Sequence, residues 1–384
     1  MQNRDTITQQ SLPKSDIVES GYLENMLKNL STSYKLFWFK GILHEIMVGE
    51  KELEFNKVVA RMIAAAWYPV VFFNLSLGIA DKLADTVWYI CDTFDIPREE
   101  SEDKIVEFIL QCKDKKLAKM IKDFTDFVPY RLIRPFYQRE IEYERKNDIY
   151  FKDGKVNGII EKYNKNDLNN AFYILDRMNH VLTVSDKWIE YIKANIMVIE
   201  GWMNYKLIEY IQLRNPSVPA IPFKIFPPNQ RKLTDATMYW DLVQNKIHLP
   251  DLYTNKEFST RNMEQYGNIS IDHFIPWSFV LHDELWNLYP AFKNVNSMKG
   301  NKLPDKDRYL NQFCEYQYQA FIIAKELPQI KKKTMEQYMT IKRDIFNIGE
   351  GDQGHEVFLN SIRNTIEPLY QIANNQGYGI WWYD

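Results

Sequence analysis

The sequence predicts a mainly α-helical protein that contains a small module of mixed α and β structure. Three observations favour this fold class. Apolar residues recur at helical spacing over residues 31–215 and again beyond residue 306. A proline-rich stretch and short segments bounded by turn residues separate these two regions. A chain of 384 residues is also longer than a single hydrophobic core usually supports, which favours more than one domain. The expected organisation is a helical N-terminal domain (1–215), a connector (216–235), the mixed module (236–306) and a helical C-terminal region (307–384).

The composition is that of a soluble globular protein, with 45% hydrophobic and 26% charged residues. The formal net charge of −3 gives no whole-chain support for nucleic-acid binding, so any basic surface must be local. Cys91, Cys112 and Cys314 form no CxxC pair, which argues against a cysteine-based zinc site and fits a reducing compartment. Residues 1–16 are polar and lack the apolar core of a signal peptide. We therefore expect a cytoplasmic protein.

One uncharged run, residues 62–80, approaches the length that spans a bilayer. Pro69 interrupts it, Asn74 and Ser76 add polar groups, and the chain has no second such run. Because proline breaks or bends a helix, the run is interpreted as a buried helix pair bent at Pro69. A membrane-anchored effector is the alternative, and sedimentation with membranes would reveal it.

Helical periodicity is clearest at two places in the N-terminal region. Ser33 is a candidate N-cap for a helix whose apolar positions are Leu36, Phe39, Leu43 and Ile46. A long helix is expected to start near Ser185 and to stop before Pro216. Neither segment carries a motif that a chemical reaction requires.

The stretch 216–235 contains five prolines: Pro216, Pro219, Pro222, Pro227 and Pro228. Proline fixes φ and removes a hydrogen-bond donor, so residues 214–233, which contain these prolines, are predicted to be extended rather than helical. This stretch is either a connector into a second module or a loop over the surface. Residues 246–258 and 266–276 are then expected to form short strands or loops, and the helical pattern returns over 309–327 and 361–373.

Four polar residues in the mixed module suggest chemistry. Asp272 and His273 are adjacent, Asn287 follows His273 by fourteen residues, and Asn296 lies nine further on in a segment, 291–301, that could form a helix. Carboxylate and amide oxygens suit Mg²⁺ or Mn²⁺ and are poor ligands for zinc, and a neutral histidine can take a proton from water. A strand, loop, strand and helix would let Asp272 and Asn296 meet at one cation beside His273. Hydrolysis of a phosphodiester bond needs a base that activates water and a cation that stabilises charge on the phosphate and the leaving oxygen.

The pattern DH-x-x-P, then N, then N-x-x-K-G-N-x-x-P, over residues 271–304, resembles the HNH (His–Asn–His) endonuclease signature. It is similar to the variant in which the last His is Asn, as in the HNH domain of RNA-guided CRISPR nucleases. The chain also resembles stand-alone bacterial HNH proteins with helical flanks. The resemblance implies a ββα-metal fold embedded between helical regions and cleavage of DNA.

The resemblance also implies roles for five residues. His273 would be the general base, and Asp272 and Asn296 would bind the divalent metal. Asn287 would hold the loop that positions His273. Lys299 could contact a substrate phosphate, although a lysine on the helix surface is the more common outcome.

Many HNH domains hold a structural zinc through two CxxC pairs, and the absence of such pairs here implies a module stabilised by packing. Core residues, rather than base-stacking ones, are expected at Trp277, Phe279, Trp286 and Leu288. The run 282–284 (His-Asp-Glu) lies in the expected loop. It is either a second metal cluster or, as we prefer, a polar loop tip that orders the site or faces substrate, because adjacency does not supply convergent ligand geometry.

The predicted function is a Mg²⁺- or Mn²⁺-dependent endonuclease acting on DNA, with a role in anti-phage defence or a mobile element suggested by the same resemblance. Residues 1–215 would recognise a target, bind a partner or restrain the nuclease. A regulatory protein partner is expected because a free nuclease endangers its host, and no membrane association is expected. Two alternatives stay open: an RNA-cleaving HNH enzyme or toxin, and a non-catalytic module that binds nucleic acid or protein.

Overall fold

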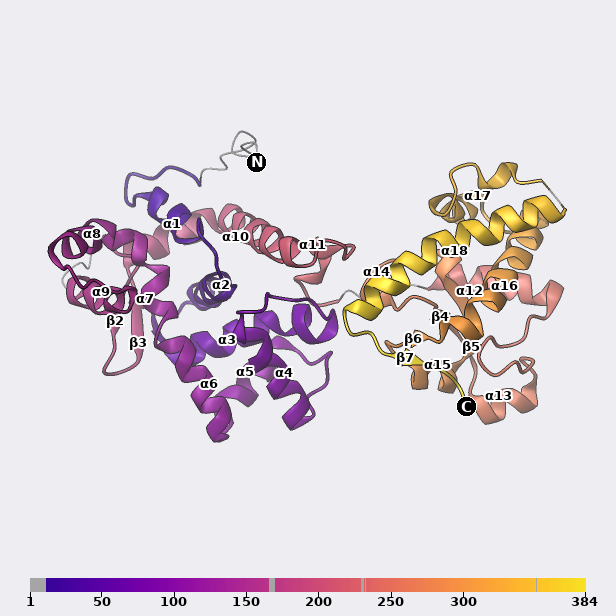
Figure 1. Ribbon diagram of the computed structural model, residues 1–384, viewed down its shortest axis with the longest axis horizontal. Coiled ribbons are helices and arrows are strands. Elements are labelled where there is room, and N and C mark those ends of the chain that lie inside the picture. The colour runs from indigo at the N-terminus through magenta and orange to yellow at the C-terminus, as the bar shows by residue number, and fades with distance from the viewer. Residues whose placement is uncertain (1–11, 166–169, 229–230, 232, 350) are drawn as a thin grey trace. The chain divides into compact units, whose positions relative to one another are not determined.

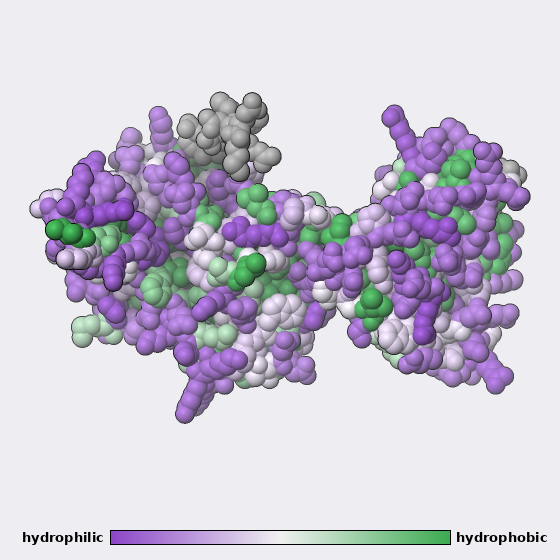
Figure 2. Space-filling view, in the orientation of Figure 1, coloured by the Kyte–Doolittle hydropathy of each residue, from purple (hydrophilic) through white to green (hydrophobic). Residues whose placement is uncertain are grey.

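The computed structural model describes residues 12–165, 170–228, 231, 233–349 and 351–384 (Figure 1). The chain divides into two compact units. The N-terminal unit runs to Pro216 and includes Lys224–Pro227, and the C-terminal unit consists of Ser217–Phe223 and Pro228–Asp384. Helices dominate both units and the sheets are small, which confirms a mainly α fold with a small α+β module. Hydrophilic residues cover most of the visible face of each unit (Figure 2).

Helices build most of the N-terminal unit. The longer ones are α1 (Ser20–Met26), α2 (Tyr34–Met47), α3 (Phe55–Trp67), α4 (Lys82–Phe94), α5 (Glu102–Gln111), α6 (Lys115–Thr125), α8 (Gln138–Asn147), α9 (Val156–Asn164) and α10 (Asp186–Arg214). The short ones are η1 (Tyr68–Phe72), α7 (Val128–Leu132), η2 (Arg134–Tyr137) and η3 (Asp153–Lys155). The predicted start and end of α10 are confirmed.

The core of the N-terminal unit forms around α2 and α3, which pack on each other. Both helices are apolar on most of their surface, so α3 can be covered by α4, α5 and α6 while α2 packs on α10. Ser33 occupies the predicted N-cap of α2, but its side chain makes no capping hydrogen bond. Its backbone lies in the helical region rather than the extended one that a capping serine adopts, and its N–H donates instead to Asp81 Oδ2 (2.6 Å).

The apolar run 62–80 is buried up to Phe73, as predicted, but only its first part is helical. Pro69 lies where α3 passes into the single π-helical turn η1, and Phe73 N–H donates to Tyr68 O at its end. The predicted second helix of the pair is wrong, because Asn74 takes a positive φ of 52° and the chain stays non-helical until Lys82. Among the described residues, no helix is both long and apolar enough to cross a membrane.

The N-terminal unit also contains a sheet that the helical periodicity does not predict. Its strands are β1 (Glu52–Glu54), β2 (Tyr173–Asp176) and β3 (Val181–Val184), arranged antiparallel in the order β1-β3-β2. Strands of three or four residues are too short for an alternating pattern to stand out from the surrounding helices.

The C-terminal unit is helical around one hairpin. Its helices are α12 (Thr234–Ile247), α13 (Thr260–Tyr266), α14 (Trp277–Val280), η4 (Leu285–Asn287), α15 (Lys293–Lys299), α16 (Lys306–Glu326), α17 (Lys332–Met335), η5 (Glu336–Thr340), η6 (Ile345–Asn347) and α18 (Asp352–Asn375). The hairpin strands are β4 (Ile269–His273) and β5 (Leu288–Phe292), and a second, parallel pair is β6 (Leu303–Pro304) with β7 (Ile380–Trp381). Helix α12 packs on both hairpin strands, and α16 packs on α12 and α18 (Figure 1).

The prediction that the proline-rich residues 214–233 exclude helix is wrong at one place. Ile221–Lys224 forms the single turn α11, and the next helix, α12, begins just beyond the stretch at Thr234. Pro222 is the second residue of α11, a position where the missing N–H would have no intrahelical partner and the fixed φ suits a helix. Proline therefore opens this turn instead of preventing it.

Candidate functional site

The hairpin of β4 and β5 brings the predicted site residues onto one framework. The strands pair antiparallel, with Asp272 opposite Tyr289 and His273 opposite Leu288. Helix α15 follows β5 directly and packs on both strands, so Asn296 on α15 faces the hairpin that carries Asp272. The strand, strand and helix order expected from the sequence is present.

The Asp272 carboxylate is buried and engaged at both oxygens. Lys299 Nζ donates to Oδ1 (2.9 Å), and the Tyr253 hydroxyl donates to Oδ2 (2.5 Å). The same ammonium donates to the His273 carbonyl (2.8 Å), so Lys299 joins two consecutive residues of β4. Only 1% of the Lys299 side chain is exposed, which rules out a position on the helix surface.

Tyr253 reaches Asp272 because its loop is fixed by another buried carboxylate, Asp251. Asp251 Oδ2 accepts from the N–H groups of Tyr253 (3.1 Å) and Thr254 (2.8 Å), and Oδ1 accepts from Phe292 N–H at the end of β5 (3.1 Å). Burial, followed by the nearby Asp272 charge, raises the pKa of Tyr253 well above its usual value. The phenol therefore keeps its proton and acts as a donor.

The His273 imidazole, at the end of β4, is paired with the carboxylate of Asp283. The distance between Nε2 and Asp283 Oδ1 is 2.8 Å, and 4% of the histidine side chain is exposed. The loop that carries Asp283 is anchored from two sides, since Leu285 N–H donates to Gln337 Oε1 (2.9 Å) and Gln317 Nε2 donates to Leu285 O (3.2 Å). A carboxylate accepts only, so Nε2 carries the proton and Nδ1 of a neutral ring is the basic nitrogen.

Asn287 is fully buried and ties the chain just beyond His273 to the start of β5. Its Oδ1 accepts from Ile275 N–H (2.8 Å) and its Nδ2 donates to Ile275 O (2.9 Å). Its backbone carbonyl also accepts from Phe274 N–H (2.8 Å). These three hydrogen bonds fix the two residues that follow His273, and hence the direction in which β4 ends.

Asn296 on α15 is half-buried and turns its amide nitrogen towards β4. Nδ2 donates to Ser270 Oγ (3.1 Å) and approaches Ile271 O (3.4 Å). With the nitrogen engaged by the strand, the side-chain oxygen Oδ1 is the atom that remains for a further ligand.

The donor set fits a hard divalent cation. The Asp272 carboxylate has about four lone-pair positions and two accept the hydrogen bonds of Lys299 and Tyr253, so capacity remains. Asn296 adds an amide oxygen. Among the described residues, no group of three or more His, Cys, Asp and Glu side chains could hold a metal. A cation held by Asp272 and Asn296 must complete its shell with water and substrate oxygens, as Mg²⁺ commonly does.

The loop residues 282–284 divide into separate roles. Asp283 pairs with His273, and Glu284 accepts from Thr340 Oγ1 (3.3 Å). The His282 ring packs against Trp286 with 5.3 Å between centroids, and burial, then the neighbouring His273, lowers the pKa of His282 to about 4. The preferred interpretation, a loop tip that orders the site, agrees with these contacts, whereas the alternative of a second metal cluster has no support among them.

Packing around the site follows the expected core residues with one exception. Phe279, Trp286 and Leu288 are buried as predicted. Trp277 is only half-buried, and the Arg231 guanidinium lies over its ring at 5.1 Å from the centroid. Tyr253 and Asp251 were not predicted as part of the site, because nothing in their spacing of 19 and 21 residues before Asp272 marks a contact.

The site therefore lies on a two-stranded antiparallel hairpin followed by a helix, with an Asp-His pair at the end of the first strand. Residues 251–305 match the family model described as HNH endonuclease. This part of the chain is therefore similar to an HNH endonuclease and is called the HNH module below; the match begins at the Asp251 loop that sets Tyr253 against Asp272. No curated protein and no solved structure matches the chain.

Proposed function

We propose that the protein is a divalent-metal-dependent endonuclease that hydrolyses phosphodiester bonds of DNA, with residues 236–306 as its nuclease module. The observation that supports it most strongly is the geometry at the end of β4. There the Asp272 carboxylate and the His273 imidazole are consecutive, and Asn296 of α15 is hydrogen-bonded to the same strand. The family match to residues 251–305 supports nuclease activity in general, and the preference for DNA rests on the HNH resemblance.

In this proposal His273 is the general base. With Nε2–H donated to Asp283, Nδ1 accepts a proton from a water molecule, whose oxygen forms a bond to phosphorus while the bond to the leaving oxygen breaks. Asp272 and Asn296 would hold Mg²⁺ or Mn²⁺, which when bound stabilises negative charge on the phosphate and the leaving oxygen. Asn287 holds the segment after His273, and Asp283 fixes the ring.

Lys299 has a different role in this proposal from contact with a substrate phosphate. Its ammonium is buried against Asp272 and the His273 carbonyl, where it holds the carboxylate in place and offsets its charge. A direct contact with phosphate would require this buried ammonium to become accessible, since only 1% of the Lys299 side chain is exposed. We therefore propose a structural and electrostatic role for Lys299, expressed through Asp272.

Metal removal provides the main test of the proposed activity. Supercoiled plasmid should be nicked or linearised by the full chain with Mg²⁺ or Mn²⁺, and EDTA should stop cleavage by withdrawing the cation from Asp272 and Asn296. Addition of excess Mg²⁺ should restore the rate. A parallel panel of labelled RNA and DNA separates the DNA enzyme from the RNA-cleaving alternative, and equal cleavage with and without EDTA would contradict the proposal.

Asp283→Asn should lower kcat by up to about 10⁴-fold, the loss typical when asparagine replaces the aspartate that sets the tautomer of a catalytic histidine. An asparagine amide can donate to Nε2, which favours the tautomer with the proton on Nδ1 and removes the base. The ¹⁵N shifts of His273 in selectively labelled protein should report this change of tautomer. Glu284→Gln is the matched control, because it neutralises the next carboxylate, which contacts Thr340 instead. Unchanged kcat and unchanged shifts in Asp283→Asn would remove Asp283 from the mechanism.

The proposed biological setting is the cytoplasm of a bacterium, where the nuclease acts in anti-phage defence or for a mobile element under the control of a regulatory protein. The resemblance to stand-alone bacterial HNH proteins supports this setting. Plaque counts in cells that express the protein or its His273→Ala variant would test it.

A further inference from the structure

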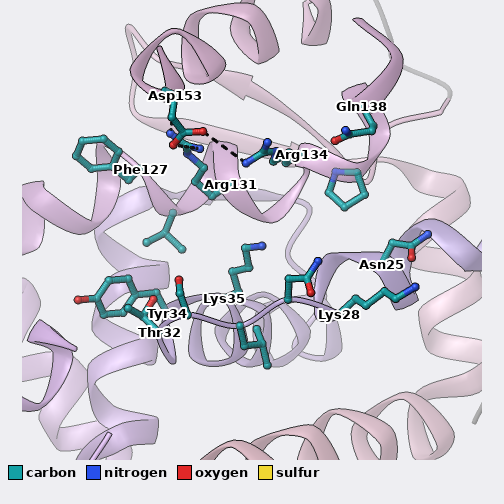
Figure 3. Close-up of a pocket in the computed structure, with 15 residues that line it drawn as sticks. Asn25, Lys28, Thr32, Tyr34, Lys35, Phe127, Arg131, Arg134, Gln138 and Asp153 are labelled. Carbon is teal, nitrogen blue, oxygen red and sulfur yellow. Dashed lines mark hydrogen bonds and ion pairs between the residues drawn. The ribbon is translucent and has the colours of Figure 1, made fainter. Parts of the chain in front are cut away.

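The N-terminal unit contains a half-open cavity of about 1180 Å³ that is separate from the HNH module. Its walls come from the end of α1, the start of α2, and α7 with η2 (Figure 3). Four basic side chains line it, Lys28, Lys35, Arg131 and Arg134, against the single carboxylate of Asp153. The lining carries four positive charges and one negative charge, a net of +3, in a chain whose formal net charge is −3.

The two arginines share that carboxylate. Arg131 Nη1 lies 2.9 Å from Asp153 Oδ2, and Arg134 Nη1 lies 3.7 Å from Oδ1. Arg131 also donates to the Asp153 carbonyl (3.0 Å). One aspartate offsets only one of the two guanidinium charges, so these contacts orient the arginines without neutralising them.

The two lysines have no carboxylate partner among the described residues. Lys28 is exposed at the edge of the cavity, whereas Lys35 is half-buried on the first turn of α2. In Figure 3 the Lys35 amine points from α2 towards Arg131 and Arg134. Burial, together with the positive charges of Arg134 and Arg131, lowers the pKa of Lys35. Packing three cations this closely costs free energy that an anion in the cavity would recover.

Phosphate groups match this arrangement best. Guanidinium groups bind phosphate oxygens in a bidentate fashion and lysine adds a mobile point charge. The wall also offers the neutral polar groups of Asn25, Thr32 and Gln138. Phe127, a lining residue that is 56% exposed, offers an apolar ring on which a base could stack. We propose that this cavity binds a nucleotide, with its phosphates at Lys35, Arg131 and Arg134.

The surface next to the cavity favours a small ligand over a polynucleotide. A second hollow of about 910 Å³ shares Asn25 and Gln138 with the first. Its lining carries three carboxylates, Asp16, Glu19 and Glu140, against the single cation Arg139. A phosphate backbone that continued from one hollow into the other would meet a net charge of −2, whereas a short polyphosphate ends before it.

Calorimetric titration of the full chain tests the proposal, with EDTA present to keep divalent cations from the HNH module. ATP and pyrophosphate should bind, inorganic phosphate should bind more weakly, and adenosine should bind at least tenfold more weakly than ATP. The double variant Lys35→Gln/Arg134→Gln should lower the affinity for ATP at least tenfold. Lys162→Gln/Arg177→Gln, which removes two exposed cations of the same unit, should leave the affinity unchanged.

Two single variants keep the test decisive if the double variant fails to fold. Lys28 is exposed, so Lys28→Gln should weaken the binding of ATP without affecting the fold. Asp153→Asn should tighten the binding of ATP because it removes the competing carboxylate. Absence of binding by every phosphate-bearing probe, or equal affinity in wild type and the folded cavity variants, would overturn the proposal. The proposal would also be overturned if a twelve-nucleotide single strand bound more tightly than ATP and the same variants lost this binding. The ligand of the cavity would then be a polynucleotide.

Discussion

The His273→Ala variant should lose nuclease activity by about 10²- to 10⁴-fold while the chain stays folded, because a general base contributes about this factor. The imidazole stands at the end of β4 and is hydrogen-bonded to Asp283. Its removal leaves Asp283 without a partner, but 28% of that side chain is exposed and water can solvate it. The Lys299 contact to residue 273 goes to the backbone carbonyl and survives the substitution.

The matched control is His355→Ala, which breaks another histidine–carboxylate pair of nearly equal length. His355 Nε2 lies 2.9 Å from Glu315 Oε2 on α16, outside the HNH module. Initial rates of plasmid cleavage at saturating Mg²⁺ should be normal in this variant and nearly zero in His273→Ala. If both variants cleave as fast as the wild type, the reaction centre lies elsewhere, or the module only binds nucleic acid or protein.

The Asp272→Ala variant should lose stability as well as activity. The carboxylate is the counter-charge of Lys299, and the two side chains are 6% and 1% exposed. Without it, the ammonium stays buried with the His273 carbonyl as its remaining partner, a change that typically costs about 3–5 kcal/mol. Amide hydrogen exchange of peptides that cover β4 and β5 should accelerate accordingly. The double variant Asp272→Ala/Lys299→Met, which replaces the cation with an apolar side chain, should recover much of the protection and none of the activity.

A surface ion pair provides the comparison for this stability effect. Lys342 and Asp344 lie 2.6 Å apart, but the Asp344 side chain is 59% exposed. Solvent screens an exposed pair of this kind, so Asp344→Ala should leave the exchange of β4 and β5 unchanged. Wild-type protection in Asp272→Ala would contradict the role of Asp272 as the counter-charge that keeps Lys299 stable in the interior.

The sequence predicts the framework of the site better than its internal contacts. The HNH resemblance implies a ββα arrangement, and the turn residues around 266–276 and the possible helix at 291–301 agree with it, so the positions of Asp272, His273, Asn287 and Asn296 could be anticipated. Tyr253 and Asp283 reach these residues only through the folded chain, by way of a buried Asp251 and two glutamines on other elements. Local patterns do not encode such long-range hydrogen bonds, and the functional roles of the predicted residues stay predictions.

In the rest of the fold, long helices could be predicted from the sequence, whereas strands and turns of a few residues could not. Helices of 14 to 29 residues, such as α2, α10 and α18, repeat their apolar pattern often enough to be recognised. The strands β1–β3 and the single turn α11 have three or four residues each and carry no such repeat. The prediction that Pro222 excludes helix was wrong because proline is tolerated in the first turn of a helix and disrupts it only further inside.

The ammonium of Lys299 separates the folding of the HNH module from the supply of metal. A zinc finger obtains its folding energy from its ion and unfolds in a chelator. Here a residue of the chain already neutralises Asp272, so we expect the module to keep its native packing when free Mg²⁺ falls. Under the proposed mechanism, a change in cation concentration would alter turnover and leave the abundance of the protein and its resistance to proteolysis unaffected.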